Sequence, residues 1–373
     1  MASILLSPPT LVLIALLLLS IADTGNDVIS VHGKHCHQAN PPYGETYFHH
    51  PTGRYCDGRI IVDFIAEALG MPFLPPFLGG SGNSTGPGFE LGVNFAVGGA
   101  TALDVEFFRE EGMRVTWTNY SLGVQMEWFK QLLPSLCSSP PSDCSNILNK
   151  SLFLVGEIGG NDCNYMFSQG MSPNKIRTFV PKIIHSIGAT INELIELGAM
   201  SLIVPGNFPI GCSPWYLTMF ESSSSSEDYD PRTGCINWLN EFAEYHNSKL
   251  QEELDRIRRL HPHATIIYAD YYNGIMSIFR SPNPFGFGAA PLAACCGSGG
   301  RYNFNAFALC GTSEGGKVCR DPSRFVSWDG IHFTEAAYRA IASGMLNGSL
   351  TVPAMNEICP SLGLRTTRSY QTL

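Results

Sequence analysis

The chain has 373 residues, 44% of them hydrophobic and 15% charged, so it can bury a large core without needing a metal or a disulfide to fold. Its 32 acidic and 23 basic residues give a net charge of −9, which argues against binding to nucleic acid or to an anionic membrane. Beyond the N-terminal run, no stretch approaches the roughly 18 apolar residues that a membrane span requires.

The N-terminus carries an apolar run, Leu11–Leu19, that leads directly into the sequence "SIADTGN". Small residues precede a cleavage site after Ala22, so residues 1–22 are predicted to be a secretion signal. The same run suits a buried first strand with Ser20 at its carboxyl end, and its length does not decide between the two. A third alternative places further residues upstream. Cleavage predicts a secreted, extracellular protein without a membrane span, whereas an uncleaved run predicts an intracellular or tethered one.

The rest of the chain alternates apolar strands with amphipathic helices. The expected helices cover residues 59–71, 118–137, 174–199, 236–260 and 334–346. The expected strands lie within 90–103, 150–164, 200–212 and 264–272. Gly70 is predicted to end the first helix and Thr334 to cap the last one. This alternation indicates βαβ units around a mainly parallel sheet, in one α/β domain over residues 23–355 with a tail at 356–373.

Polar turns follow the predicted strands, where functional groups gather in sheets of this kind. In "WDGIH", Asp329 and His332 are close enough for the carboxylate to hold one imidazole nitrogen. The other nitrogen would then be free to act as a general base. The competing interpretation is a capping Asp beside an unrelated surface His, and for so short a motif alone it is the stronger one.

Two glycine turns offer hydrogen-bond donors for a developing oxyanion. "GGND" contributes the side-chain amide of Asn161, and "VGGAT" contributes the backbone amides of Gly98 and Gly99. Acyl transfer needs such preorganised donors. The competing interpretation is that the glycines serve turns with positive φ and that Asn161 caps a loop. That interpretation is weakened here because several such turns follow predicted strands.

Cysteines and glycosylation sequons indicate an extracytoplasmic protein. The 12 cysteines include no C-x-x-C pair, which argues against a zinc ribbon or a dithiol redox site. The short loops Cys137–Cys144 and Cys310–Cys319 are predicted to be closed by disulfides. Sequons occur at four positions: Asn83, Asn119, Asn149 and Asn347.

Other histidines and aromatic residues receive simpler interpretations. The tract at 32–38 places His32, His35, Cys36 and His37 together as a metal site would. No second ligand cluster accompanies it, so we predict a solvated loop. His261 and His263 are assigned to a turn before a strand. The aromatic pairs near residues 271 and 304 are predicted to line the core or a pocket.

Long blocks carry a family resemblance. The chain contains "DTGN", "PTGRYCDGRIIVDFIAEALG", "GVNFAVGGATALD", "SLFLVGEIGGNDCNY" and "VSWDGIHFTEAAYR" in that order. From about Ile21 to about Pro353 it therefore resembles the plant GDSL esterase/lipase family, a branch of the SGNH hydrolases. The resemblance implies a three-layer α/β/α fold. It also implies hydrolysis of small-molecule or lipid carboxylic esters without a cofactor or a metal.

The resemblance also implies roles for individual residues. Ser20 would be the nucleophile, His332 the base and Asp329 its orienting partner. The backbone amide of Ser20, a glycine of "VGGAT" (Gly99) and Asn161 would form the oxyanion hole.

The first block departs from the family pattern. The family reads Phe-Gly-Asp-Ser at the nucleophile, whereas this chain reads Leu17-Leu18-Leu19-Ser20. Loss of the Asp predicts reduced activity. Loss of Ser20 with a signal peptide would leave an inactive binding protein, and a purely structural glycoprotein is the least supported alternative. Cys56 stands where the family commonly has serine, which predicts an unpaired thiol.

Overall fold

The computed structural model describes most of the chain after the N-terminal segment. The described residues are 14–17, 20–31, 33, 36–80, 89, 91–114, 117–136, 141–288 and 290–358, with only the backbone described for 14–17, 141–143 and 358. The predicted tail at 356–373 therefore lies almost wholly outside the described residues, as do Asn83 and Cys137.

A six-stranded sheet forms the centre of the molecule, in the order β2-β1-β3-β4-β5-β8. Its strands are β1 (Ile14–Leu17), β2 (Val93–Asn94), β3 (Leu152–Val155), β4 (Ser201–Pro205), β5 (Thr265–Ala269) and β8 (Thr351–Val352). All pairs are parallel except β5 with β8. The apolar N-terminal run thus supplies an inner strand, which pairs with β2 on one side and with β3 on the other.

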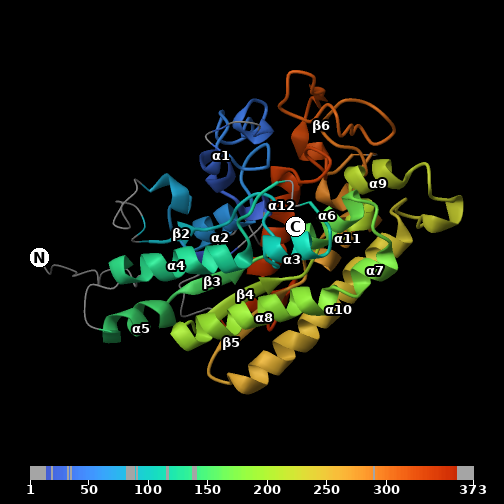
Figure 1. Ribbon diagram of the computed structural model, residues 1–373. Helices are drawn as coiled ribbons and strands as arrows, with labels where there is room; N and C mark the ends of the chain where they lie inside the picture. The colour runs from blue at the N-terminus through green and yellow to red at the C-terminus, as the bar shows by residue number, and fades with distance from the viewer. Residues whose placement is uncertain are drawn as a thin grey trace, which may run out of the picture.

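Helices connect and cover these strands (Figure 1). They are α1 (Asn26–Ser30), α2 (Ile61–Ala68), α3 (Val105–Glu110), α4 (Leu122–Leu136), α5 (Pro141–Asn149), α6 (Gly160–Ser168), α7 (Pro173–Arg177), α8 (Val180–Leu197), α9 (Pro214–Phe220), α10 (Asn237–Leu260), α11 (Tyr271–Arg280), α12 (Glu335–Leu346) and α13 (Met355–Ile358). A separate two-stranded sheet joins β6 (Cys296–Gly297) to β7 (Lys317–Val318). Among the described residues, none of these helices is long and apolar enough to cross a membrane.

Alternation along the strands divides the core into two layers. Phe153 and Val155 of β3 are buried in a cluster with residues of α4, α8 and α10, which Figure 1 shows together on one side of the sheet. Leu152 and Leu154 are buried in a second cluster with residues of α2, α11 and α12. Successive side chains of a strand point to opposite faces, so the sheet is covered on both. The predicted three-layer α/β/α fold with a mainly parallel sheet is confirmed.

Several predicted boundaries are confirmed and others are wrong. Gly70 has φ 69° just beyond α2, and the Thr334 hydroxyl accepts a hydrogen bond from the backbone of Ala337 as an N-cap. The helix expected over 174–199 is instead two helices, α7 and α8. Pro181 lies in the first turn of α8, where its missing N–H costs no hydrogen bond, whereas inside a continuous helix it would break one.

Two predicted strand segments contain the start of a helix. β3 ends at Val155 and α6 begins at Gly160. Gly159, with φ 102°, is the N-cap residue of this helix. β5 ends at Ala269 and α11 follows at once, because the Asp270 side chain accepts a hydrogen bond from the backbone of Asn273 as an N-cap. Within the described residues 91–103, β2 has only two residues, and the turn around Gly98 and Gly99 follows it.

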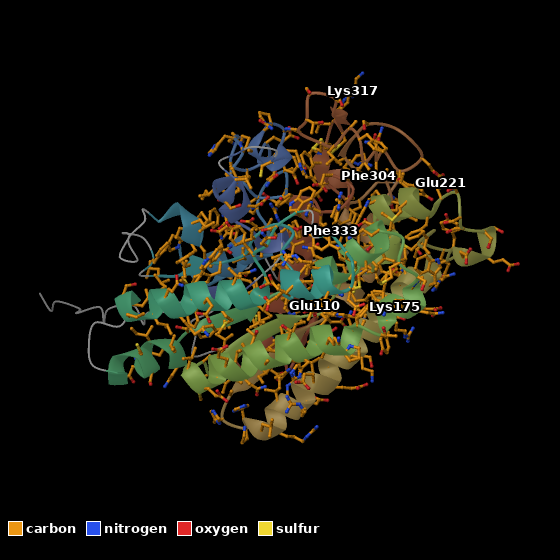
Figure 2. All side chains as sticks on the ribbon, in the orientation of Figure 1. Glu110, Lys175, Glu221, Phe304, Lys317 and Phe333 are labelled. Atoms are coloured by element: carbon orange, nitrogen blue, oxygen red, sulfur yellow. A yellow bond between two sulfur atoms is a disulfide. The ribbon has the colours of Figure 1, made fainter. Side chains whose placement is uncertain are left out.

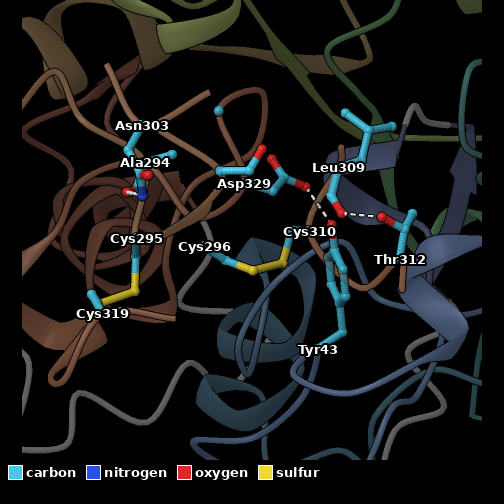
Figure 3. The surroundings of a disulfide bond; sticks show 12 residues. Tyr43, Ala294, Cys295, Cys296, Asn303, Leu309, Cys310, Thr312, Cys319 and Asp329 are labelled. Carbon is cyan, nitrogen blue, oxygen red and sulfur yellow. Dashed lines mark hydrogen bonds between the residues drawn. A yellow bond between two sulfur atoms is a disulfide. The ribbon is translucent and has the colours of Figure 1, made fainter. Parts of the chain in front are cut away.

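The disulfides differ from the predicted pairing. Three bridges join Cys212 to Cys235, Cys295 to Cys319 and Cys296 to Cys310. The predicted bridge Cys310–Cys319 is therefore wrong. Antiparallel pairing of β6 with β7 places Cys319 opposite Cys295, and the neighbouring Cys296 points away to reach Cys310 (Figure 3).

The remaining cysteines within the described residues are bonded or buried. Cys144 is disulfide-bonded, but its predicted partner Cys137 lies outside the described residues, so that pairing stays a prediction. Cys56 is a buried free thiol, as expected, and so are Cys36 and Cys163.

Candidate active site

Three of the predicted site residues lie just after neighbouring strands of the sheet. Ser20 follows β1 and opens a short 3-10 helix, Ser20–Ala22. Gly99 lies in the turn after β2, and Asn161 lies in the first turn of α6, just after β3. Because β1 has β2 on one side and β3 on the other, the chain connections diverge there, and a crevice forms at the carboxyl ends of such strands.

Ser20, His332 and Asp329 form a continuous chain of polar contacts. Ser20 Oγ lies 2.9 Å from His332 Nε2. On the other side of the ring, His332 Nδ1 lies 2.8 Å from Asp329 Oδ2. His332 and Asp329 are 4% and 5% exposed, so water is largely kept from their contact. This geometry allows the imidazole to accept the serine proton while the carboxylate holds the ring in place.

The surroundings of Asp329 keep its carboxylate ionised. Burial alone would raise its pKa, but attraction to His332 and hydrogen bonds hold the pKa well below its ordinary value. Asp329 Oδ1 accepts from the backbone N–H groups of Ile331, at 3.0 Å, and His332, at 2.8 Å. Tyr43 OH donates to Oδ2 over 2.9 Å (Figure 3). A charged Asp329 can therefore stabilise a positive charge on the His332 ring.

The turns of Gly99 and Asn161 are linked to each other. Tyr165 OH of α6 donates to the Gly99 carbonyl over 2.7 Å, and Asn161 Nδ2 donates to the Ala100 carbonyl over 3.1 Å. The Asn161 amide has a second N–H that remains for a ligand. Gly99 adopts φ 78°, and a Cβ there would overlap the ring of Trp117, so glycine is required on two counts.

Asp23 joins the nucleophile segment to the "VGGAT" turn. It is fully buried, and its Oδ1 accepts from the backbone of Gly25 and Asn26, both at 2.7 Å. Its Oδ2 accepts from the backbone of Asp27 at 3.0 Å and of Gly98 at 2.8 Å. Burial raises the pKa of Asp23 to about 7 in spite of these donors. The only sequence signal for this link is an acid in the polar turn that follows the apolar N-terminal run.

All five predicted site residues line one cavity of about 270 Å³. The walls are mainly apolar and aromatic, formed by Tyr43, Tyr55, Trp117, Trp215, Phe304 and Leu309. The expectation that the aromatic residues near 304 line a pocket is therefore confirmed, and Tyr271 is buried as expected. Ser20, Gly99, Asn161, Asp329 and His332 thus converge on a space that could hold an ester.

The prediction of a solvated loop at 32–38 is wrong for residues 36–38. Cys36 is buried, and His37 lines the cavity with its ring against Tyr55, at 5.8 Å between centroids. The cause is a buried carboxylate, because Asp27 accepts hydrogen bonds from Gln38 at 2.8 Å and from Tyr55 at 2.6 Å, which draws this segment onto the site.

The metal alternative gains no support from the described part of this tract, which excludes His32 and His35. The described residues hold no group of three or more potential metal ligands. His261 ends α10 and contacts Asn192 Oδ1 through Nε2 at 2.9 Å, in agreement with a turn role.

Comparison with known proteins identifies the family. The GDSL-like lipase/acylhydrolase family matches residues 20–345. Two GDSL esterase/lipases of Arabidopsis thaliana are similar: one is 53% identical over 91% of this chain and 85% of its own length, the other 50% identical over 95% and 89%. A sinapine esterase of Brassica napus is 50% identical over 91% of this chain and 86% of its own length. The chain therefore belongs to the GDSL-like lipase/acylhydrolase family, whose chemistry is the hydrolysis of carboxylic esters.

Proposed function

We propose that this protein hydrolyses carboxylic esters through an acyl-enzyme formed on Ser20. The observation that carries the proposal is the unbroken contact from Ser20 Oγ through the His332 ring to Asp329, at 2.9 and 2.8 Å, beside an apolar cavity. His332 Nε2 takes the serine proton as Oγ bonds to the ester carbonyl carbon. The proton then passes to the leaving alcohol as the C–O bond breaks.

A water molecule completes the cycle. His332 removes a proton from water as its oxygen attacks the acyl carbon, and Ser20 Oγ leaves with that proton. In both steps the carbonyl oxygen becomes negatively charged. The backbone amides of Ser20 and Gly99 and the side-chain amide of Asn161 are the proposed donors to it. No step requires a cofactor or a metal.

The substrate class follows from the walls of the cavity. Its aromatic and apolar lining favours a small-molecule or lipid ester with an apolar part. The Brassica napus relative is named for sinapine, so sinapine is one rational test substrate. The net charge of −9 argues against nucleic acid as a partner.

We also propose passage through the secretory pathway. Asn119, Asn149 and Asn347 are exposed and open to glycosylation, and three disulfides join described residues. Activity requires that the N-terminal run be retained, since a chain cut after Ala22 would lose both Ser20 and β1. Such a chain would be the inactive binding protein of the alternative hypothesis.

Two measurements on the protein recovered after passage through the secretory pathway, whether released or tethered, test the proposal. Intact mass after deglycosylation gives the mature N-terminus, which should lie upstream of Ser20. Hydrolysis of 4-nitrophenyl butyrate should fall at least about 1,000-fold in Ser20→Ala. Ser223→Ala, in the exposed serine-rich loop, is the matched control and should behave as the wild type. Unchanged hydrolysis in Ser20→Ala would contradict the mechanism.

A further inference from the structure

The segment 98–103, which carries Gly99, belongs to no helix or strand. We call it the oxyanion segment, because the Gly99 amide is one of the proposed oxyanion donors. It follows β2 and leads into α3, whose last residue, Glu110, is labelled in Figure 2. A segment without a regular backbone ladder is positioned by other contacts, since its buried polar groups still need partners. Those contacts therefore decide where the Gly99 N–H points.

Two buried carboxylates hold the ends of the oxyanion segment. At its start, Asp23 Oδ2 accepts a hydrogen bond from the Gly98 N–H over 2.8 Å. At its end, Asp162 Oδ2 accepts from the N–H of Ala102 over 2.8 Å. The other oxygen of the same side chain accepts from the N–H of Leu103 over 2.9 Å. The oxyanion segment is thus held between two acids that come from other parts of the chain.

Each of these acids lies beside another residue of the proposed site. Asp162 directly follows Asn161 in the first turn of α6. Asp23 directly follows the short 3-10 helix that Ser20 opens, and its backbone N–H donates to the Ser20 carbonyl over 3.3 Å. A connected path therefore runs from the nucleophile, through the oxyanion segment, to the helix that carries Asn161. All three proposed oxyanion donors belong to this path.

The middle of the oxyanion segment is also held from α6. Tyr165 OH donates to the Gly99 carbonyl over 2.7 Å. The Gly98 N–H is already used by Asp23. The Gly99 N–H, in contrast, has no acceptor among the described residues. Of the two glycine amides in this turn, that of Gly99 is therefore the one that remains for an oxyanion.

Asp23 and Asp162 are retained at an electrostatic cost. Both are fully buried, and among the described residues their donors are all backbone N–H groups, without a cation. Burial raises the pKa of each to about 7 in spite of these donors. A neutral Asn would avoid the cost of a buried charge, but its side chain has one acceptor oxygen, whereas both oxygens of Asp162 accept. Holding two successive N–H groups therefore requires the carboxylate.

We propose that Asp23, Asp162 and Tyr165 are positioning residues that hold the Gly99 N–H toward the developing oxyanion. They act through the oxyanion segment and not on the ester itself. As Ser20 Oγ bonds to the ester carbon, its proton passes to the base and the carbonyl oxygen becomes negatively charged. The Gly99 N–H meets that oxygen only while the segment is held. This inference rests on the proposed function and specifies how its oxyanion hole is assembled.

Replacing Asp162 with Asn tests the carboxylate at constant size. The amide presents an N–H to one of the two backbone N–H groups and can no longer hold both. At about pH 8.5, where the wild-type acid is ionised, kcat per folded molecule for 4-nitrophenyl butyrate should fall about 10- to 100-fold with little change in KM. Circular dichroism gives the folded fraction. Asp230→Asn is the matched control, because Asp230 also accepts from two backbone N–H groups but does not line the cavity; it should keep the wild-type kinetics.

Replacing Tyr165 with Phe is a milder test of the same segment. The variant loses one hydroxyl group and keeps the ring, so it gives an answer even if Asp162→Asn does not fold. Its kcat should fall about 3- to 10-fold, as expected for the loss of one hydrogen bond that acts in the transition state.

A matched pair of ketones separates positioning from a general loosening of the site. Benzyl trifluoromethyl ketone bonds through its carbonyl carbon to Ser20 Oγ, the serine proton passes to His332, and the ketone oxygen becomes an oxyanion. Benzyl methyl ketone has nearly the same shape and binds as the neutral ketone. In both variants the Ki of the trifluoromethyl ketone should rise by about the factor by which kcat falls, whereas the Ki of the methyl ketone should stay unchanged.

Three outcomes would count against these assignments. An unchanged kcat in folded Asp162→Asn or in Tyr165→Phe would overturn the inference while leaving ester hydrolysis intact. An equal rise in both Ki values would do the same, since it would assign these residues to the general shape of the cavity. Absence of ester hydrolysis and of trifluoromethyl ketone binding in the wild type would instead overturn the proposed function, and this inference with it.

Discussion

The hydroxyl of Tyr43 donates a hydrogen bond to Asp329 Oδ2 over 2.9 Å, to the same oxygen atom that contacts His332 Nδ1. Tyr43 is 1% exposed, and its ring packs against Trp328 at 5.8 Å between centroids. Trp328 directly precedes Asp329 in the chain. Tyr43 therefore fixes both the position of the carboxylate and the segment that carries it, and it acts on catalysis through Asp329.

Replacing Tyr43 with Phe should lower kcat by about 10- to 150-fold, because a buried hydrogen bond to a charged group contributes about 1.5–3 kcal/mol. KM for a short aryl ester should change little, since the ring that lines the cavity is retained. Steady-state kinetics separate the two parameters. Tyr47→Phe, with a 40% exposed side chain, is the control and should leave both unchanged. A rise in KM with constant kcat would assign Tyr43 to substrate binding instead.

Replacing Asn161 with Ala should lower kcat by about 100- to 1,000-fold if its free N–H binds the oxyanion. The side chain also donates to the Ala100 carbonyl, so thermal unfolding must be measured beside the kinetics. Asn161→Asp offers a close isostere without the N–H and should lose activity to a similar degree. If the activity of either variant fell only in proportion to its loss of folded protein, the oxyanion role of Asn161 would be contradicted.

His246 should make the protein less stable at acid pH. It is fully buried beside Gly159, and neither ring nitrogen has a partner among the described residues. Burial lowers its pKa from 6.5 to about 4. Because this folded-state pKa lies below the unfolded one, its contribution to stability is complete above pH 6.5 and is lost as the pH falls toward 4. The loss should reach about 2 kcal/mol near pH 5.

Urea unfolding of the wild type and His246→Met across this pH range measures the effect. The raised pKa values of Asp23 and Asp162, both about 7, act in the opposite direction, since protonation favours the folded state there as the pH falls. The difference between the two proteins cancels those contributions. A difference that does not vary with pH would show that His246 is not held neutral by the fold.

Local patterns in the sequence were sufficient to predict part of the fold and part of the candidate site. Helix α12 and its Thr334 cap, and the contact between Asp329 and His332, depend on residues within a few positions of one another. The alternation of strands and helices was enough to predict the sheet and the edge at which Ser20 and Asn161 meet. These features follow from periodicity, capping and the parallel arrangement of strands.

Long-range contacts could not be predicted in the same way. Tyr43 and Asp329 are 286 residues apart, and nothing in "PPYGETYF" indicates which acid its tyrosine would reach. The polar segment around His37 predicts exposure to solvent. In the structure, the neighbouring Gln38 donates a hydrogen bond to the buried Asp27, and this contact draws the segment inward.

The place of β1 between two partner strands has a consequence for quality control in the cell. If residues 14–17 were trimmed away, β2 and β3 would each present an unpaired edge in the middle of the sheet. Unpaired edges recruit strands from other molecules, and native proteins avoid exposing them. A trimmed molecule would thus be prone to aggregate and to be degraded, which argues against the alternative of a stable, inactive binding protein. Only molecules that retain the N-terminal segment, and with it Ser20, would then remain folded and escape degradation.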